Sequence, residues 1–263
     1  MQDDALARLR RSLARIERAD WQEDTAPFSL GLPDIDDFIG GGLPHGALHE
    51  VFPESAADCG AGIGFALALA LRANGKAGRP LLWVRQDMAA QEQGELHAAG
   101  LAEFGADPSA FLLVRARDAV QALRAADEAL RCTALGAVVI EVWGEARALD
   151  LTASRRLARG AARAGCCVLL VRSGAAPAPS AAMSRWRVRA SPSRLLAAEA
   201  PGRPAFDIGL LRHRAGYPPR RWRVEWDRDE LVFRPPALSR AVAALPADRP
   251  AAPAAAEGRR RAG

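Results

Sequence analysis

The sequence predicts an α/β fold with a mostly parallel sheet flanked by helices and with antiparallel strands on its C-terminal side. Up to residue 172, short apolar runs rich in β-branched residues alternate with helical patterns. This alternation is typical of parallel strands that helices cover on both faces. From residue 184 the pattern changes to alternating apolar and polar residues without helices, which indicates antiparallel strands.

The first part is expected to contain strands and helices in strict alternation. These are strand 48–52, helix 61–73, strand 81–85, helix 88–99, strand 111–115, helix 118–131, strand 137–143, helix 150–164 and strand 166–172. In the second part the stretches RWRVRAS, FDIGLLRHRA, RRWRVEWDRD and ELVFRPP are expected to be strands, with a hairpin turn at Asp227 to Asp229. Trp222 and Trp226 then share one strand face, a spacing that favours a core position over base stacking.

The two ends of the chain differ from the middle. Residues 1–24 predict an amphipathic helix whose apolar face packs either on its own domain or on a neighbouring chain. That face, the candidate partner-docking surface, consists of Leu6, Leu9, Leu13 and Ile16. Residues 236–263 are rich in proline, alanine and arginine and are predicted to be disordered. Residues 25–235 are therefore expected to form the single α/β domain.

Composition favours a cytoplasmic protein without a membrane span. The N-terminus has no apolar core of signal-peptide type, and no stretch reaches the roughly 18 uninterrupted apolar residues of a spanning helix. The four cysteines contain no C-x-x-C pair and are expected to be buried free thiols. A net charge of +5 permits contact with nucleic acid without establishing it.

One stretch carries a specific motif. GGGLPHGALHEVFPES, residues 40–55, resembles the start of the nucleotide site in the RecA recombinase family. In that family a Gly-Gly-Leu-Pro-x-Gly turn leads to a strand that ends Glu-Ile-Tyr-Gly-Pro-Glu-Ser-Ser-Gly-Lys-Thr. The matching residues are Gly41, Gly42, Leu43, Pro44, Gly46, Glu50, Pro53, Glu54 and Ser55, with Asp34-Ile35 upstream.

Within that superfamily the chain is similar to the ImuA family, RecA-like accessory proteins of bacterial translesion DNA synthesis. The shared features are the leading Leu/Arg helix, LPDIDDFIGGGLPHGALHEV and the late LLRHRAGYPPRRWRVEW. In outline the resemblance covers residues 1–235, and its specific motifs lie in the first third. It implies a RecA-like core.

The phosphate loop in this position is degenerate. Pro53, Glu54 and Ser55 are kept, whereas Ala57, Asp58 and Cys59 stand where the family has Gly, Lys and Thr. Exchanging a cation for an anion about 4 Å from a phosphate forfeits roughly 4 kcal/mol at an effective dielectric near 20 and adds repulsion. Lys76, the only lysine of the chain, lies beyond the following helix. ATP is therefore not expected as a cofactor unless an arginine reaches in from elsewhere.

Other catalytic positions match the family only in part. Asp87 lies where the resemblance places the water-activating carboxylate, and Glu141 lies near the magnesium ligand. Each could equally be a helix cap or a solvated group. After CCVLLVR the family has a glutamine that senses the γ-phosphate, whereas this chain continues from Arg172 with Ser173. The sequence therefore predicts a pseudo-ATPase without a catalytic site, and the histidine spacing predicts no metal site.

DNA contact is a further expectation. The segments that correspond to the DNA-binding loops of the recombinases are short or lack basic residues. Arg185, Arg187 and Arg189 alternate along a predicted strand and could hold a phosphate backbone weakly. The alternative is a solvated strand face.

The favoured function is a non-catalytic RecA-like adaptor in damage-induced translesion synthesis, the SOS mutagenesis response. The resemblance implies an ImuB-type polymerase-like protein as partner and, through it, the error-prone DNA polymerase III α subunit and the sliding clamp; RecA is a further candidate. Two alternatives stay open. One is a DNA-dependent ATPase or recombinase with an unconventional site, and the other is a cell-division inhibitor of the SulA type.

Overall fold

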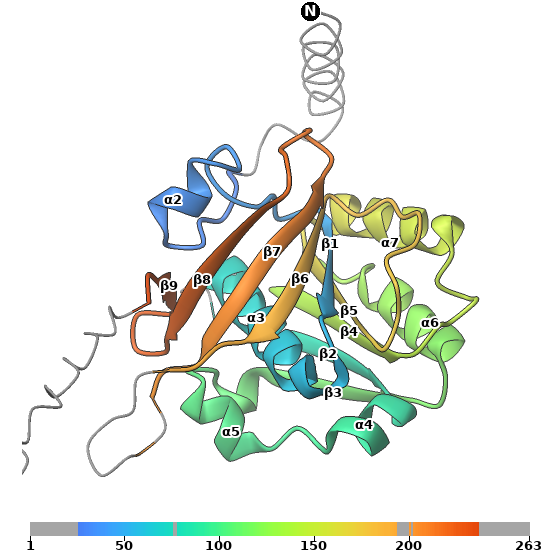
Figure 1. The fold of residues 1–263 in the computed structure, drawn as a ribbon. Coiled ribbons are helices and arrows are strands. Elements are labelled where there is room, and N and C mark those ends of the chain that lie inside the picture. The colour runs from blue at the N-terminus through green and yellow to red at the C-terminus, as the bar shows by residue number, and fades with distance from the viewer. Residues whose placement is uncertain (1–25, 76–77, 194–199, 201, 237–263) are drawn as a thin grey trace, which may run out of the picture.

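The computed structural model describes residues 26–75, 78–193, 200 and 202–236, and these form one nine-stranded sheet with helices on both faces (Figure 1). The strand order is β3-β2-β4-β5-β1-β6-β7-β8-β9. The strands are β1 (Leu48–Pro53), β2 (Leu81–Gln86), β3 (Phe111–Ala116), β4 (Ala137–Trp143), β5 (Cys167–Ser173), β6 (Ser184–Ala190), β7 (Ala205–His213), β8 (Arg220–Asp227) and β9 (Val232–Arg234).

The predicted fold class is confirmed. Neighbouring strands from β3 to β6 are parallel, and those from β6 to β9 are antiparallel. One detail differs from the expectation, because β6 belongs to both groups. It lies parallel to β1 on one side and antiparallel to β7 on the other. The predicted hairpin turn lies between β8 and β9, at residues 228–231.

The helices follow the predicted pattern closely. Asp118 and Asp150 accept hydrogen bonds from backbone amides at the starts of α6 and α7, and Gly165 ends α7 in the left-handed conformation. The helices are α2 (Pro33–Asp36), α3 (Cys59–Asn74), α4 (Asp87–Gln93), α5 (Ala98–Glu103), α6 (Ala119–Ala129) and α7 (Leu151–Ala164), with 3-10 turns at Ala56–Asp58 and Pro108–Ala110.

The single helix expected at 88–99 is wrong, because the chain forms two short helices there. Gly94 has φ +79°, outside the helical region, and it ends α4. Only after an extended stretch does α5 begin at Ala98. A glycine adopts this conformation without the steric cost that a side chain would add.

Two apolar cores lie on opposite faces of the sheet (Figure 1). On one face α3 packs against the strands from β2 to β9, and Trp226 and Val224 are fully buried there. On the other face α6 and α7 pack against β2, β4 and β5. The expected core position of the β8 tryptophans is therefore confirmed, since Trp222 packs against the first core.

A buried hydrogen-bonded chain joins β1 to β6. The ring Nε2 of His49 lies 3.1 Å from the Pro44 carbonyl oxygen, and Nδ1 lies 2.8 Å from Ser184 Oγ. A carbonyl only accepts, so Nε2 carries the proton and Nδ1 accepts from the serine hydroxyl. The same hydroxyl accepts from the Trp186 indole at 2.8 Å. Burial lowers the pKa of His49 to about 4, although the hydrogen bond to Pro44 opposes the shift.

Several expectations concern parts of the chain that the structure does not describe. The docking residues Leu6, Leu9, Leu13 and Ile16 and nearly all of the C-terminal tail lie outside the described residues. The domain boundaries therefore stay predictions. Among the cysteines, three are buried as expected, but Cys132 is exposed because it follows α6 in a surface loop.

One segment within the described residues, Ala56–Asn74, is long and apolar enough to cross a membrane by length and composition. It consists of a 3-10 turn and α3, the central helix of the first core, and 67% of its apolar window is buried inside the fold. The core position explains its composition.

Candidate functional site

The degenerate loop between β1 and α3 closes on itself. After β1 the backbone is extended at Ser55 and then enters the 3-10 turn Ala56–Asp58, in which the Asp58 amide donates to the Ser55 carbonyl at 3.1 Å. A phosphate loop instead keeps its backbone amides free to surround an anion.

The Asp58 carboxylate fixes this turn. Its Oδ2 accepts a hydrogen bond from Ser55 Oγ at 2.5 Å, and its Oδ1 accepts from the backbone amide of Ala190, at the end of β6, at 2.9 Å. Asp58 is buried. The residue at the lysine position of the motif therefore links the loop to a neighbouring strand, and its negative charge faces inward.

The residues on both sides of the turn are packed tightly. A Cβ at Gly62 in α3 would lie only 2.7 Å from Pro53 Cγ, so this glycine allows the helix to contact the end of β1. Cys59, at the place of the magnesium-binding hydroxyl, is buried, and its Sγ lies 3.7 Å from the Ser55 carbonyl oxygen. Burial raises the pKa of the Cys59 thiol, although a hydrogen bond with Ser173 opposes the shift. A neutral thiol is a poor ligand for magnesium.

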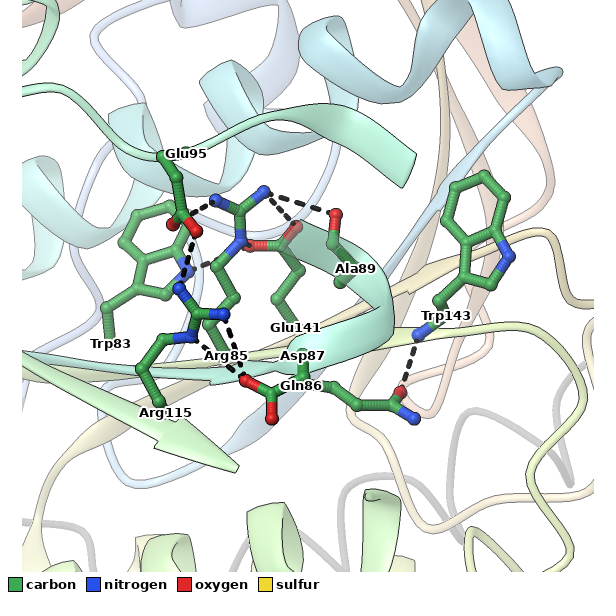
Figure 2. Close-up of polar contacts among 9 residues, drawn as sticks. All are labelled: Trp83, Arg85, Gln86, Asp87, Ala89, Glu95, Arg115, Glu141 and Trp143. Carbon is green, nitrogen blue, oxygen red and sulfur yellow. Dashed lines mark hydrogen bonds and ion pairs between the residues drawn. The ribbon is translucent and has the colours of Figure 1, made fainter. Parts of the chain in front are cut away.

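Glu141 lies towards the carboxyl end of β4 and is fully buried. Its Oε2 is 3.0 Å from Arg85 Nε and accepts from the Trp83 indole at 3.1 Å, while Oε1 accepts from Arg85 Nη2 at 3.1 Å (Figure 2). Burial raises the pKa of Glu141, and Arg85 and Trp83 act in the opposite direction. The carboxylate predicted near the magnesium position is thus held by a guanidinium and an indole of β2.

Asp87 starts α4 beside β2, and its Oδ1 lies 3.0 Å from the Arg115 side chain of β3. Arg115 also contacts Glu95 at 2.5 Å, and the other oxygen of Glu95 lies 3.8 Å from Arg85 (Figure 2). Hydrogen bonds to Glu95 and Asp87 raise the pKa of Arg115. Asp87 and Glu141, the two predicted carboxylates, are therefore the two ends of one chain of ion pairs, which we call the β2–β4 ion network.

A further buried arginine, Arg172, lies at the end of β5 beside the end of β1. The family's glycine before Pro53 is missing from this chain, and the Arg172 guanidinium lies 5.8 Å from the centre of the Phe52 ring. Arg172 is buried at the end of β5 and pairs with Glu145 at 3.7 Å. The end of β1 is thus filled by an aromatic ring and a guanidinium, where a phosphate loop needs a glycine.

Arg185 does not belong to an exposed basic strip, contrary to the expectation. Its Nε lies 2.7 Å from the Glu50 carboxylate on β1, both side chains are buried, and Arg185 also donates to the Ala178 carbonyl. The reason is strand register, because Glu50 and Arg185 are direct partners across β1 and β6. Arg187 and Arg189, in contrast, lie on the outer face of β6, and Arg189 is exposed.

The arginines of these strands are the feature that motif comparison missed. Arg85, Arg115 and Arg172 each pair with a carboxylate towards the carboxyl ends of their strands, and Arg185 pairs with Glu50 near the start of β6. The sequence does contain a signal for such contacts, namely an arginine within an apolar strand. A charge that is buried in the fold requires a partner of opposite charge. Within the part of the chain that the structure describes, no group of three His, Cys, Asp or Glu side chains could hold a metal ion.

No family model matches the sequence. Among curated proteins, the chain is similar to Protein ImuA of Caulobacter vibrioides, from strains NA1000 / CB15N and ATCC 19089 / CIP 103742 / CB 15. The identity is 34% over 217 residues in each case, covering 78% of this chain and 79% of the relative.

Among solved structures, the fold is similar to the crystal structure of the RadB recombinase, with a TM-score of 0.52 and 17% identity. The match covers 76% of this chain and 96% of RadB. At this identity the likeness shows the fold alone, and it confirms the RecA-like architecture.

Proposed function

The chain belongs to the ImuA family, and from this premise we propose that it is a non-catalytic, RecA-like accessory protein of damage-induced translesion DNA synthesis. It acts by binding other proteins of that system. The partner we propose is an ImuB-type polymerase-like protein, which connects it to the error-prone DNA polymerase III α subunit and the sliding clamp. RecA is a further candidate partner.

One observation carries the proposal that the protein does not hydrolyse ATP. The residues at the positions of nucleotide chemistry are engaged with one another: Asp58 with Ser55 and Ala190, and Glu141 with Arg85 and Trp83. Binding a nucleoside triphosphate and magnesium here would require a buried ion pair to separate, which is costly. The RecA-like sheet is kept, and its interior is stabilised by these internal contacts.

A calorimetric titration of ATP and magnesium into the full chain tests the absence of a nucleotide site. We expect no saturable heat at micromolar to millimolar nucleotide. Saturable micromolar binding that is lost in Glu141→Gln or Asp87→Asn would overturn the proposal in favour of a DNA-dependent ATPase with an unconventional site. Retention of the same binding in both variants would overturn it as well, by placing a nucleotide site elsewhere.

Co-purification with the ImuB-type protein of the same organism tests the adaptor role. We propose that the apolar face of residues 1–24 docks this partner, so Leu9→Asp with Leu13→Asp should abolish co-purification. The matched control is Arg8→Asp with Arg11→Asp, which introduces the same side chains on the predicted polar face and should leave binding intact.

The outcomes separate the adaptor role from the docking site. If the full chain does not bind the ImuB-type protein, the adaptor role is wrong. If binding survives the leucine substitutions but is lost on deletion of residues 237–263, the tail is the docking element and the N-terminal assignment is wrong.

A further inference from the structure

The antiparallel strands have α3 on one face (Figure 1). A positively charged hollow lies on their other, outer face. Its volume is about 460 Å³, within the usual size range of ligand sites. We call it the arginine groove. It is lined by Glu54, Arg187, Arg189, Asp207, Ile208, Gly209, Arg221, Trp222 and Arg223.

Strand register arranges the arginines in two rows across β6, β7 and β8. The first row is Arg187, Gly209 and Arg221. A Cβ at Gly209 would lie 3.4 Å from Arg221 Cγ and 4.0 Å from Arg187 Cβ. Because glycine has no side chain, the side chain of Arg221 can extend over the backbone at this position. The glycine therefore forms the floor of the groove between two arginines.

The second row lies two residues along each strand, which is about 7 Å at the rise of an extended chain. It consists of Arg189, Asp207 and Arg223. Asp207 orients both arginines, at 2.8 Å from Arg189 Nη2 and 2.8 Å from Arg223 Nε. Burial raises the pKa of Asp207, but the hydrogen bonds from the two arginines lower it further, so the net shift is downward.

The groove keeps a net positive charge. Its four guanidinium groups face two carboxylates, Asp207 and Glu54. Glu54 is a loose partner, at 3.9 Å from Arg189 and 4.0 Å from Arg221. Arg187 has no ionic partner among the residues that the structure describes. Two arginines of the groove, Arg187 and Arg221, are therefore not held by a close internal carboxylate.

We infer that the arginine groove binds the phosphodiester backbone of single-stranded DNA. The planar guanidinium fork matches phosphate oxygens in pairs. The two rows are separated by a distance close to that between successive phosphates of an extended strand. A hollow of this volume holds a short stretch of the backbone of one strand.

The position of the groove in the sheet favours a nucleic acid over an acidic peptide. An extended peptide gains affinity from main-chain hydrogen bonds to an exposed sheet edge. The groove lies on the face of β6, β7 and β8 and not along a sheet edge: β6 and β7 are paired on both sides, and β8 pairs with β9 at Glu225–Asp227. A phosphodiester needs only the side-chain donors that the groove provides.

The groove differs from the three-arginine strip expected from the sequence. Arg185 is absent from it because Glu50 holds that side chain in the interior, and Arg221 and Arg223 of β8 take part instead. The inference does not depend on the proposed adaptor role, since DNA binding is measured on the purified chain alone.

Fluorescence anisotropy with a labelled oligothymidylate of about 16 nucleotides, the upper end of single-domain site sizes, tests the inference. We compare the full chain with Arg187→Ala/Arg221→Ala, which removes the two arginines that lack a close partner. The matched control is Arg131→Ala/Arg156→Ala, which removes the same charge from exposed arginines on the helical side. The three arginines at 259–261 are identical in all proteins compared.

We expect the groove variant to bind at least about tenfold more weakly at low salt, and its slope of log K against log salt to fall by about 1.4, or 0.7 for each lost contact. The control variant should match the full chain. Unfolding by urea should occur at the same midpoint in all three proteins, which shows that the groove variant is folded.

Three outcomes would overturn the inference. In the first, the groove variant binds as tightly as the full chain. In the second, the control variant loses as much affinity, which indicates a diffuse charge effect. In the third, polyglutamate displaces the oligonucleotide at lower charge concentration than unlabelled oligothymidylate does, which would assign the groove to an acidic protein segment.

Discussion

The Arg85 guanidinium of β2 lies against the Glu141 carboxylate of β4, with Nε 3.0 Å from Oε2 and both side chains buried (Figure 2). The two residues are direct partners in the parallel pairing of these strands, so the contact follows from strand register. The carboxylate at the end of β4 is therefore neutralised from within the fold. This contact makes the interior of the sheet sensitive to the loss of either charge.

Removing one partner of this pair should destabilise the protein strongly. Glu141→Ala leaves the Arg85 charge buried with only the distant Glu95 carboxylate, and we expect a loss of about 3–5 kcal/mol in the free energy of unfolding. Replacing both residues, as Arg85→Met/Glu141→Leu, should restore much of that stability, because no charge then remains buried. Urea unfolding followed by circular dichroism measures both changes.

The exposed pair Arg156 and Asp127, at 3.0 Å, provides the control. Asp127→Ala should cost at most about 1 kcal/mol, because solvent screens an exposed ion pair. If Glu141→Ala and Asp127→Ala lower the free energy of unfolding by equal amounts, the contact between Arg85 and Glu141 does not have the proposed structural importance.

His49 should make stability depend on pH. The folded state holds the ring neutral with a pKa of about 4, chiefly because it is buried, whereas the unfolded chain protonates it near 6.5. Between these values the unfolded state binds more protons, so the contribution of His49 is complete above pH 6.5 and is lost as the pH falls towards about 4. The full difference corresponds to about 3 kcal/mol.

Urea unfolding at several pH values from about 4.5 to about 7.5, which covers most of the interval between the two pKa values and about one unit above it, measures this contribution. The variant His49→Gln should be less stable at neutral pH but should lose less stability on acidification than the full chain does. The exposed His97 provides the control, and His97→Gln should follow the full chain. Parallel curves for His49→Gln and the full chain would show that another group titrates.

The order of strands and helices could be predicted from the sequence because each element carries its own period of apolar residues. The apolar runs of β4 and β5 and the capping residues Asp118 and Asp150 are local signals. The break at Gly94 was not predicted, since a single glycine within an apolar pattern is compatible with a continuing helix.

The partners of the buried charges could not be predicted, because they depend on which strands become neighbours. Asp87 and Glu141 were recognisable as carboxylates at strand ends, but their partners Arg115 and Arg85 come from other strands. Arg185 alternates with Arg187 and Arg189 in the sequence and still lies buried. The carboxylate of Glu50 lies opposite it on β1 and forms an ion pair with it, a contact that the sequence of β6 alone does not reveal.

Asp58 should stabilise the loop without taking part in nucleotide binding. Asp58→Ala removes the acceptors of Ser55 and Ala190 and should lower the free energy of unfolding by about 1–3 kcal/mol. A variant that restores the family residues, Ala57→Gly/Asp58→Lys/Cys59→Thr, should be destabilised as well. We expect it not to bind ATP, because Phe52 and Arg172 still fill the end of β1.

Calorimetry and urea unfolding of the same preparations check both parts of the Asp58 prediction. Asp37 is exposed and serves as the control, because Asp37→Ala should change the free energy of unfolding little. Saturable ATP binding by the restored variant would show that the loop opens readily and that the sequence change alone abolished the site.

Asp207 should restrain DNA binding in the arginine groove. Its carboxylate bonds both Arg189 and Arg223, and its lowered pKa keeps it ionised at neutral pH. Asp207→Asn removes one negative charge and leaves the two guanidinium groups in place. We therefore expect severalfold tighter binding of oligothymidylate at low salt and a steeper salt dependence, measured by anisotropy. The gain should shrink as salt rises, since it is electrostatic.

Asp127→Asn, which removes the same charge beside Arg156 on the helical side, should leave the affinity unchanged. Weaker binding by Asp207→Asn would mean that this carboxylate chiefly positions the arginines, and equal gains from both variants would indicate a general charge effect in place of a defined groove.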